Sequence, residues 1–177
     1  DNMMTQPKGL TAASGVDVLT HALEAYVSIM ASDYTDGLAL RAMKLVLNYL
    51  ERAYDDGTDV EARDPMANAS CLAGMAFANA FLGVNHSMAH KLGAYHHIAH
   101  GLANAVILTR VMRYNAAERP VKMGTFPQYD HPKTLARYAE AGRFCGITGK
   151  DDREVFENFV ARIEELKAPV GVPETIA

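Results

Sequence analysis

Apolar residues recur at three- and four-residue steps along most of this sequence, and that period restricts what the chain can fold into. Residues 16–30 and 35–54 both follow it. A period near 3.6 residues places such positions on one face of a helix. The sequence has no segment with the alternating pattern of a convincing strand, and it has no internal repeat. We therefore predict an all-α helical bundle, with any sheet lying outside this chain.

Capping and turn residues set the expected ends of these helices. Ser14 is the predicted N-cap of the first helix, which would place the charge of Asp17 in the first helical turn. The second helix should end before the turn cluster Asp55-Asp56-Gly57. Further helices are predicted over residues 86–95, 102–117, 132–145 and 151–168, and a long loop with two prolines is predicted over residues 119–130.

Residues 65–82 differ from the other helical segments, because small and apolar residues occupy nearly every position. A helix that is apolar on all sides is typical of a buried position. Alanine and glycine also allow neighbouring backbones to approach closely. We therefore predict a central helix here, surrounded by the others.

Charge and cysteine usage exclude several classes of protein. The net charge is -4, and the sequence has no run of lysine and arginine, so we expect no nucleic-acid partner. The sequence has no stretch long and apolar enough to span a bilayer, and we expect no membrane association. The two cysteines, Cys71 and Cys145, lie far apart, which favours a reducing compartment and predicts a cytoplasmic protein.

Histidines gather in one part of the sequence. Five of the seven fall between His86 and His100. Clustered imidazoles suit divalent zinc, iron, copper or nickel. Earlier in the chain, Asp17 and His21 stand four residues apart, which puts a carboxylate and an imidazole on one helical face. If these segments fold together, they predict a metal site, although the Asp17–His21 spacing alone is more typical of a solvated surface pair.

The spacing within the histidine cluster leaves other interpretations open. His86 and His90 have the spacing of a zinc peptidase motif, but the intervening Ser-Met-Ala lacks the glutamate that would act as general base. His96 and His97 are adjacent, so on a helix they point about 100° apart and at least one should lie on the surface. The pair His100-Gly101 also fits a helix C-terminus with its terminating glycine.

Two segments resemble the signatures of the iron-containing alcohol dehydrogenases. They are GVDVLTHALEAY (residues 15–26) and HSMAHKLGAYHHIAHG (residues 86–101). The similarity extends to the alcohol dehydrogenase half of the bifunctional aldehyde-alcohol dehydrogenases. It is carried by MAFANAFLGVNHSMAHKLG (75–93), ASDYTDGLAL (31–40), MRYNA (112–116) and FPQY (126–129).

The resemblance implies a fold and a ligand set. Residues 1–177 would form the C-terminal, helical, iron-binding domain of a larger dehydroquinate-synthase-like fold, as a fragment that lacks the upstream nucleotide-binding domain and ends early. The implied metal ligands are Asp17, His21, His86 and His100. His90 matches the histidine that lines the cleft beside the nicotinamide, where it would relay a proton or only pack beside the cofactor. Its spacing to His86 also leaves it open as a fifth ligand. The family usually has proline before the last histidine, where this sequence has Ala99, so a rigid turn is lost.

The resemblance also implies an activity. The expected reaction is the NAD-linked, Fe²⁺-dependent interconversion of a short-chain aldehyde, such as acetaldehyde, and a primary alcohol. Zn²⁺ is an alternative ion, since it outbinds ferrous iron at most nitrogen and oxygen sites. Candidate wall residues, which equally fit a hydrophobic core, are Phe77, Phe81, Leu82 and Met88.

The expected partners and the alternative functions follow from the same resemblance. A homo-oligomer or filament is expected, with a fused aldehyde dehydrogenase domain in the full-length protein. By itself the chain should be weakly active or inactive, because it has no glycine-rich phosphate-binding run. The alternatives are a zinc-dependent polyol dehydrogenase or lyase of the same structural group, and a helical oligomerisation module.

Overall fold

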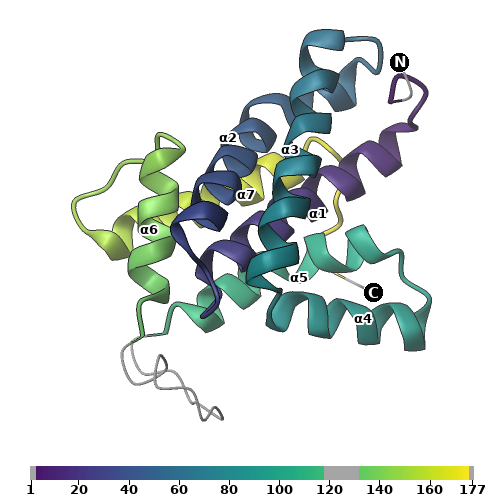
Figure 1. The fold of residues 1–177 in the computed structure, drawn as a ribbon. Coiled ribbons are helices and arrows are strands. Elements are labelled where there is room, and N and C mark those ends of the chain that lie inside the picture. Colours follow the sequence, from purple (N-terminus) through teal and green to yellow (C-terminus); the bar gives the residue numbers. More distant parts are fainter. Residues whose placement is uncertain (1–2, 118–131, 176–177) are drawn as a thin grey trace.

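The computed structural model describes residues 3–117 and 132–175, and within them it contains helices and no strand. The predicted all-α bundle is therefore confirmed. The predicted loop over residues 119–130, which includes the FPQY motif, lies outside the described residues. The helices are α1 (Lys8–Val27), α2 (Asp33–Asp55), α3 (Val60–Ala80), α4 (Val84–His96), α5 (His100–Asn115), α6 (Thr134–Phe144) and α7 (Asp152–Lys167) (Figure 1).

The central helix of the bundle is α1. It packs against α2, α3, α5 and α6, and it buries residues on several of its faces. The prediction that residues 65–82 form the central helix is wrong. The buried positions of α3 fall mainly on one stripe, while Cys71 and Met75 on the same helix are exposed. Small side chains made α3 look apolar on every side, although only the stripe facing α1 and α2 is covered.

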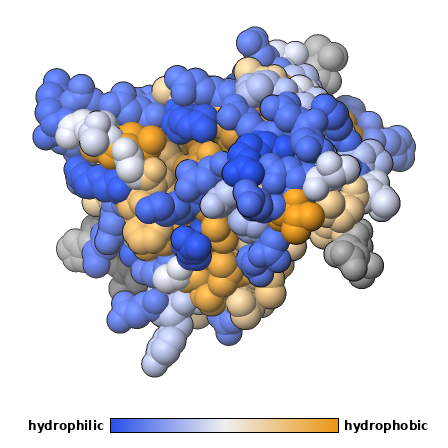
Figure 2. Space-filling view, turned by 90° about the horizontal axis from the view of Figure 1, so that it is seen from above, coloured by the Kyte–Doolittle hydropathy of each residue, from blue (hydrophilic) through white to orange (hydrophobic). Residues whose placement is uncertain are grey.

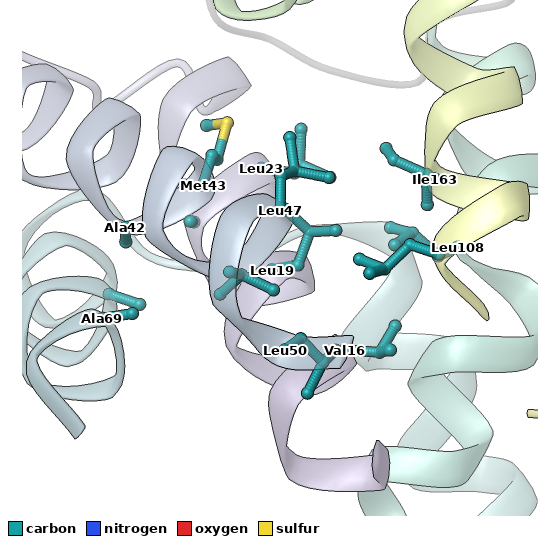
Figure 3. Close-up of a cluster of buried hydrophobic side chains, with 14 of the residues drawn as sticks. Val16, Leu19, Leu23, Ala42, Met43, Leu47, Leu50, Ala69, Leu108 and Ile163 are labelled. Atoms are coloured by element: carbon teal, nitrogen blue, oxygen red, sulfur yellow. The ribbon is translucent and has the colours of Figure 1, made fainter. Parts of the chain in front are cut away.

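The core lies where α1 and α2 meet α5 and α7. Leu19 and Leu23 of α1 point toward Leu47 of α2, while Leu108 and Ile163 approach from α5 and α7 (Figure 3). Each leucine is almost fully buried, and such burial stabilises the fold by about 1.5–3 kcal/mol per side chain. This core fixes α1 relative to α5, two of the helices that carry the site described below.

Alanines line the contact between α2 and α3. Ala42 and Ala69 face each other there (Figure 3), and both are fully buried. Most other buried positions of α3 are also alanines. With so little side chain between them the two helices can pack closely, as the small residues of this segment predict.

Two helices, α1 and α3, begin five or more residues earlier than the sequence predicts. The N-cap of α1 is Pro7, and Ser14 lies inside the helix, where its hydroxyl donates to the carbonyl of Leu10 at 2.6 Å. The predicted N-cap at Ser14 is therefore wrong. The N-cap of α3 is Asp59, whose side chain accepts from the backbone N–H of Ala62, so Pro65 lies inside this helix. In both cases the early turns bury few residues, and an apolar stripe reveals them poorly.

A sharp change of direction separates α3 from α4. Phe81 adopts a positive φ of 64°, which non-glycine residues rarely do, and the axes of the two helices differ by 104°. The hydroxyl of Ser28, just after α1, donates to the carbonyl of Ala80 and ties the end of α3 to α1. This turn brings the start of α4 against the C-terminal half of α1, where Asn85 and His86 contact Glu24.

The surface formed by the described residues carries both apolar and hydrophilic side chains. Figure 2 shows apolar residues reaching the surface in a band between hydrophilic ones. Among these residues no single helix is long and apolar enough to cross a membrane, and α3 and α4 meet that test only as a bent pair. Several large apolar side chains of α3, α4 and the turn between them are exposed, namely Met75, Phe81, Val84, Met88 and Tyr95.

Candidate metal centre

Four side chains from three helices converge at one point of the bundle. Asp17 and His21 lie one turn apart on α1, His86 lies in the first turn of α4, and His100 is the first residue of α5. Each offers one ligand atom, and these atoms all lie within 4.8 Å of one another. The structure therefore brings together all four residues that the sequence predicts as metal ligands.

The cluster is buried on one side and open on the other. The side chain of His86 is 3% exposed, whereas that of His100 is 46% exposed. Asp17 and His21 are intermediate. A small molecule would therefore reach the cluster from the side of His100, and the deeper ligands are shielded from water.

Hydrogen bonds fix the orientation of two imidazole rings. The Nδ1 of His21 lies 2.7 Å from the carbonyl oxygen of Asp17, and the Nδ1 of His86 lies 2.6 Å from the Oε2 of Glu24. Because a carbonyl and a carboxylate only accept, both Nδ1 atoms must donate. In a neutral ring the other nitrogen, Nε2, then carries a lone pair.

The two Nε2 atoms face each other at 3.1 Å. Two lone pairs at this distance repel, so a positive centre must lie between or beside them. In the absence of a cation this centre is a proton on one ring. A divalent cation at the same place would satisfy both lone pairs at once, so the donor set fits a metal ion.

The pKa values of the clustered side chains depend on their burial and on the charges beside them. Burial disfavours the charged form of His86, but Asp17 and Glu24 outweigh it and raise the pKa of this imidazole to about 9. Burial lowers the pKa of His21. Burial alone would raise the pKa of Asp17, yet the surrounding imidazoles hold it below its usual value. The shared proton therefore resides on His86, while Asp17 is ionised.

Asn104 of α5 connects two more of the donors. Its Nδ2 donates to Oδ1 of Asp17 at 2.7 Å and lies 3.1 Å from Nε2 of His100. The amide can donate to that nitrogen only if the nitrogen carries a lone pair. The Nε2 of His100 thus also carries a lone pair, and this nitrogen lies 3.7 Å from Oδ2 of Asp17.

The resulting donor set is three imidazole nitrogens and one carboxylate. Nitrogen-rich sites of this kind suit iron and zinc, whereas magnesium and calcium prefer oxygen ligands alone. One carboxylate leaves a divalent ion with net positive charge. The chemistry of the site therefore fits either Fe²⁺ or Zn²⁺.

The remaining histidines of the sequence cluster lie outside this group. His90 is exposed, and its ring stacks on that of His100 with centroids 5.4 Å apart. His96 and His97 are both exposed, which confirms that at least one lies on the surface. The alternative of a helix end at His100-Gly101 is wrong, because α5 begins at His100.

One of the candidate wall residues contacts the ligands. The ring of Phe77 on α3 lies 4.6 Å from that of His21, measured between centroids. Phe81 and Met88 are exposed, and Leu82 is half-buried. Contact of any of them with a substrate stays a prediction.

Sequence reasoning missed the polar residues behind the ligands. Glu24, Asn85 and Asn104 are buried and bonded to ligands or to one another. A signal for one of them was present: Glu24 follows Asp17 by seven residues and thus lies on the same helical face. Nothing in the spacing alone indicated that this face would meet the start of α4.

The fold and the donor set describe a helical domain whose four converging side chains could hold a metal ion. Residues 11–177 match the model of the Fe-containing alcohol dehydrogenase family, C-terminal. The chain belongs to the iron-containing alcohol dehydrogenase family, and its fold is that of the family's C-terminal domain.

Known proteins share both sequence and fold with this chain. The bifunctional aldehyde-alcohol dehydrogenase AdhE of Escherichia coli (strain K12) is 49% identical over 177 residues, covering 98% of this chain and 20% of that protein. A crystal structure of 1,3-propanediol oxidoreductase has a TM-score of 0.84 at 40% identity, covering 97% of this chain and 41% of that one.

A third relative was solved with a cofactor. Sulfoacetaldehyde reductase from Bifidobacterium kashiwanohense, in complex with NAD+, has a TM-score of 0.80 at 29% identity, covering 98% of this chain and 40% of that one. The chain thus spans about a fifth to two fifths of the length of these relatives.

Metal affinity should depend on pH through His86. The pKa of this group is raised to about 9, so at pH 7 a cation must displace its proton. Displacing one proton makes the apparent affinity for Zn²⁺ rise about tenfold per pH unit up to pH 9 and level off above it. Competition with a chelator at several pH values measures this slope, and an affinity independent of pH between 7 and 9 would contradict it.

Proposed function

We propose that this chain is the metal-binding domain of an NAD-linked alcohol dehydrogenase that interconverts short-chain aldehydes, such as acetaldehyde, and primary alcohols. Asp17, His21, His86 and His100 would hold Fe²⁺. One observation carries the proposal: four donors from three helices lie within 4.8 Å, with imidazole lone pairs directed at one another. Such an arrangement is stable as a neutral set only around a cation.

The relatives support the reaction and the cofactor. They include a bifunctional aldehyde-alcohol dehydrogenase, a 1,3-propanediol oxidoreductase and a sulfoacetaldehyde reductase bound to NAD+. All three names describe alcohol–aldehyde chemistry, and one describes the nicotinamide cofactor. We infer the same reaction class for the protein that carries this chain.

Buried and exposed residues of the site would have different roles. The buried His86 and the half-buried Asp17 would bind the ion from the protein side, and Phe77 beside His21 would exclude water from part of the wall. When bound, a divalent ion supplies Lewis acidity toward an alcohol or aldehyde oxygen, and NAD supplies the redox chemistry. The exposed His90, stacked on His100, is placed to pass a proton between the open side of the site and solvent.

The setting of the domain is also a proposal. We infer a cytoplasmic protein in which residues 1–177 are the helical domain and NAD binds mainly to a separate nucleotide-binding domain. The similarity to the bifunctional AdhE favours a fused aldehyde dehydrogenase domain in the full-length protein. A homo-oligomer or filament stays a prediction.

Two measurements test the proposal together. Protein purified without oxygen should contain stoichiometric iron, and it should reduce acetaldehyde with NADH when the nucleotide-binding part is present. If metal analysis finds zinc at full occupancy, the native ion is zinc and not iron. Absence of any bound divalent metal would overturn the proposed site.

Exposure to air distinguishes iron from zinc. If Fe²⁺ occupies the site, storage in air should remove most of the activity, and anaerobic treatment with Fe²⁺ and a reductant should restore it. The open side at His100 gives oxygen access to the ion. Protein reconstituted with Zn²⁺ is the control and should be indifferent to air, since zinc has no redox chemistry. Full activity after prolonged aerobic storage of the iron form argues against iron.

Replacing His90 tests the proton-transfer role. His90→Gln should leave the metal content unchanged, because His90 lies outside the group of four donors. It should lower kcat roughly 10²-fold, the lower end for a positioned acid–base group, since solvent can partly replace it. The pH profile of kcat should flatten in the variant. An unchanged kcat would show that His90 only packs beside the site.

A further inference from the structure

Glu24 is a buried carboxylate that lies behind the ligands and is not one of them. The residue is 4% exposed, on the face of α1 that also carries Asp17. Its Oε2 accepts a hydrogen bond from Nδ1 of His86 at 2.6 Å. Since Nδ1 and Nε2 lie on different sides of the ring, this carboxylate contacts the side of His86 that faces away from His21.

The same carboxylate binds the backbone at the start of α4. Its Oε1 accepts from the backbone N–H of Asn85 at 2.7 Å, and its Oε2 accepts from that of His86 at 3.3 Å. The N-cap of α4 is Gly83, which has no side chain with which to bind these donors. Glu24 therefore caps α4 from another helix.

Gly83 makes room for this contact. A Cβ added at Gly83 would lie 2.9 Å from Oε1 of Glu24. The turn before α4 is thus fitted around the carboxylate. Both the backbone and the ring of His86 are held by one side chain of α1, the helix that also supplies Asp17 and His21.

Charge gives Glu24 a second effect on the site. Glu24 places a second carboxylate in the region that holds Asp17, and a pair of acidic side chains there would favour a bound cation. A carboxylate that accepts from Nδ1–H also makes the imidazole a stronger donor through Nε2. Both effects act on the affinity for a cation.

We propose that Glu24 is a positioning residue: by binding the backbone and the Nδ1–H of His86, it aims the Nε2 of this ring at the other donors and sets the metal affinity of the site. This inference rests on the proposed metal site. A role confined to capping α4 would affect stability alone.

The test compares Glu24→Gln with a matched control. Gln keeps the shape but removes the charge and turns one acceptor into a donor. We expect the Zn²⁺ affinity of the purified protein, measured by chelator competition, to fall roughly 10- to 100-fold. Glu164→Gln is the control: this carboxylate on α7 accepts from Thr109 and Lys167, away from the site. The affinity of the Glu164→Gln variant for Zn²⁺ should match that of the unmodified protein.

A second variant moves the carboxylate without removing it. Gly83→Ala places a methyl group against Oε1, so the carboxylate must shift, and we expect a smaller loss of Zn²⁺ affinity in the same direction. In the Zn²⁺-loaded protein, the NMR resonance of the His86 Nδ1 proton should also move upfield in Glu24→Gln, since an amide oxygen is a weaker acceptor than a carboxylate.

The outcomes separate the inference from the function on which it rests. If the unmodified protein binds Zn²⁺ tightly and Glu24→Gln binds it equally well, the positioning role is wrong and the metal site stands. If thermal stability falls in Glu24→Gln but affinity and the Nδ1 proton resonance do not change, Glu24 only caps α4 and the inference is overturned. If the unmodified protein binds neither Zn²⁺ nor Fe²⁺, the metal site and the role of Glu24 fail together.

Discussion

Replacing Asp17 with Asn is expected to abolish tight binding of divalent metal and to lower alcohol dehydrogenase activity about a thousandfold. Asp17 is the only anionic residue among the four donors. Its Oδ1 lies 3.6 Å from a nitrogen of both His21 and His86, and its Oδ2 lies 3.7 Å from Nε2 of His100. A metal that acts as a Lewis acid lowers the free energy of the transition state by several kcal/mol. A loss of about 4 kcal/mol of this stabilisation corresponds to a thousandfold lower rate.

A matched substitution separates this effect from a general loss of stability. Asp36 pairs with Arg137 at 2.6 Å and joins α2 to α6, away from the ligands. Asp36→Asn should lower the unfolding temperature and leave the metal content unchanged. Metal content by elemental analysis and NADH-linked acetaldehyde reduction are the two measurements. Full metal occupancy in Asp17→Asn would remove Asp17 from the ligand set.

Replacing Gly101 with Ala is expected to destabilise the fold and to disturb the metal site at once. A Cβ at this position would lie 2.6 Å from the backbone oxygen of Ala13 on α1. Backbone atoms cannot move aside as a flexible side chain can, so α5 must shift away from α1. Overpacking of this kind costs typically about 1–3 kcal/mol. The neighbouring His100 would move with the helix, so metal affinity should fall as well.

Gly74 provides the control for this substitution. It also lies within a helix, but a Cβ there would meet nothing within 4 Å. Gly74→Ala should stabilise α3 by about 0.5–1 kcal/mol, because alanine is the better helix former, and it should leave metal affinity unchanged. Denaturant unfolding and chelator competition on both variants test the pair. Equal stability of Gly101→Ala and Gly74→Ala would show that α5 can shift away from α1 without loss of stability.

The helices themselves were largely predictable from the sequence, and their boundaries were less so. Leu19 and Leu23 lie four residues apart on α1, and Leu47 and Leu50 lie three residues apart on α2. Such periodicity depends only on neighbours within one helix. The start of α3 was misplaced at Pro65, since proline is common in a first turn and the true N-cap at Asp59 precedes a turn with little apolar content. The buried helix was likewise misassigned, because small residues do not reveal which face is covered.

The candidate site was predictable as a set of residues but not as a geometry. The four donors followed from the resemblance of two motifs to a family, and the structure places all four within reach of one ion. Spacing could not decide whether His90 belongs with them, and in the structure it lies beside the group rather than in it.

By itself, then, the sequence determined that the chain is helical, because helical periodicity is a local property. Its two motifs also identified the candidate metal ligands, through their resemblance to a family. Only the tertiary structure decided that α1 is the central helix and that Glu24 and Asn104 support the ligands from behind. Those relations join residues 62 and 87 positions apart, such as Glu24 with His86 and Asp17 with Asn104. Contacts of that range arise when the apolar faces of several helices pack together, and no local pattern in the chain encodes them.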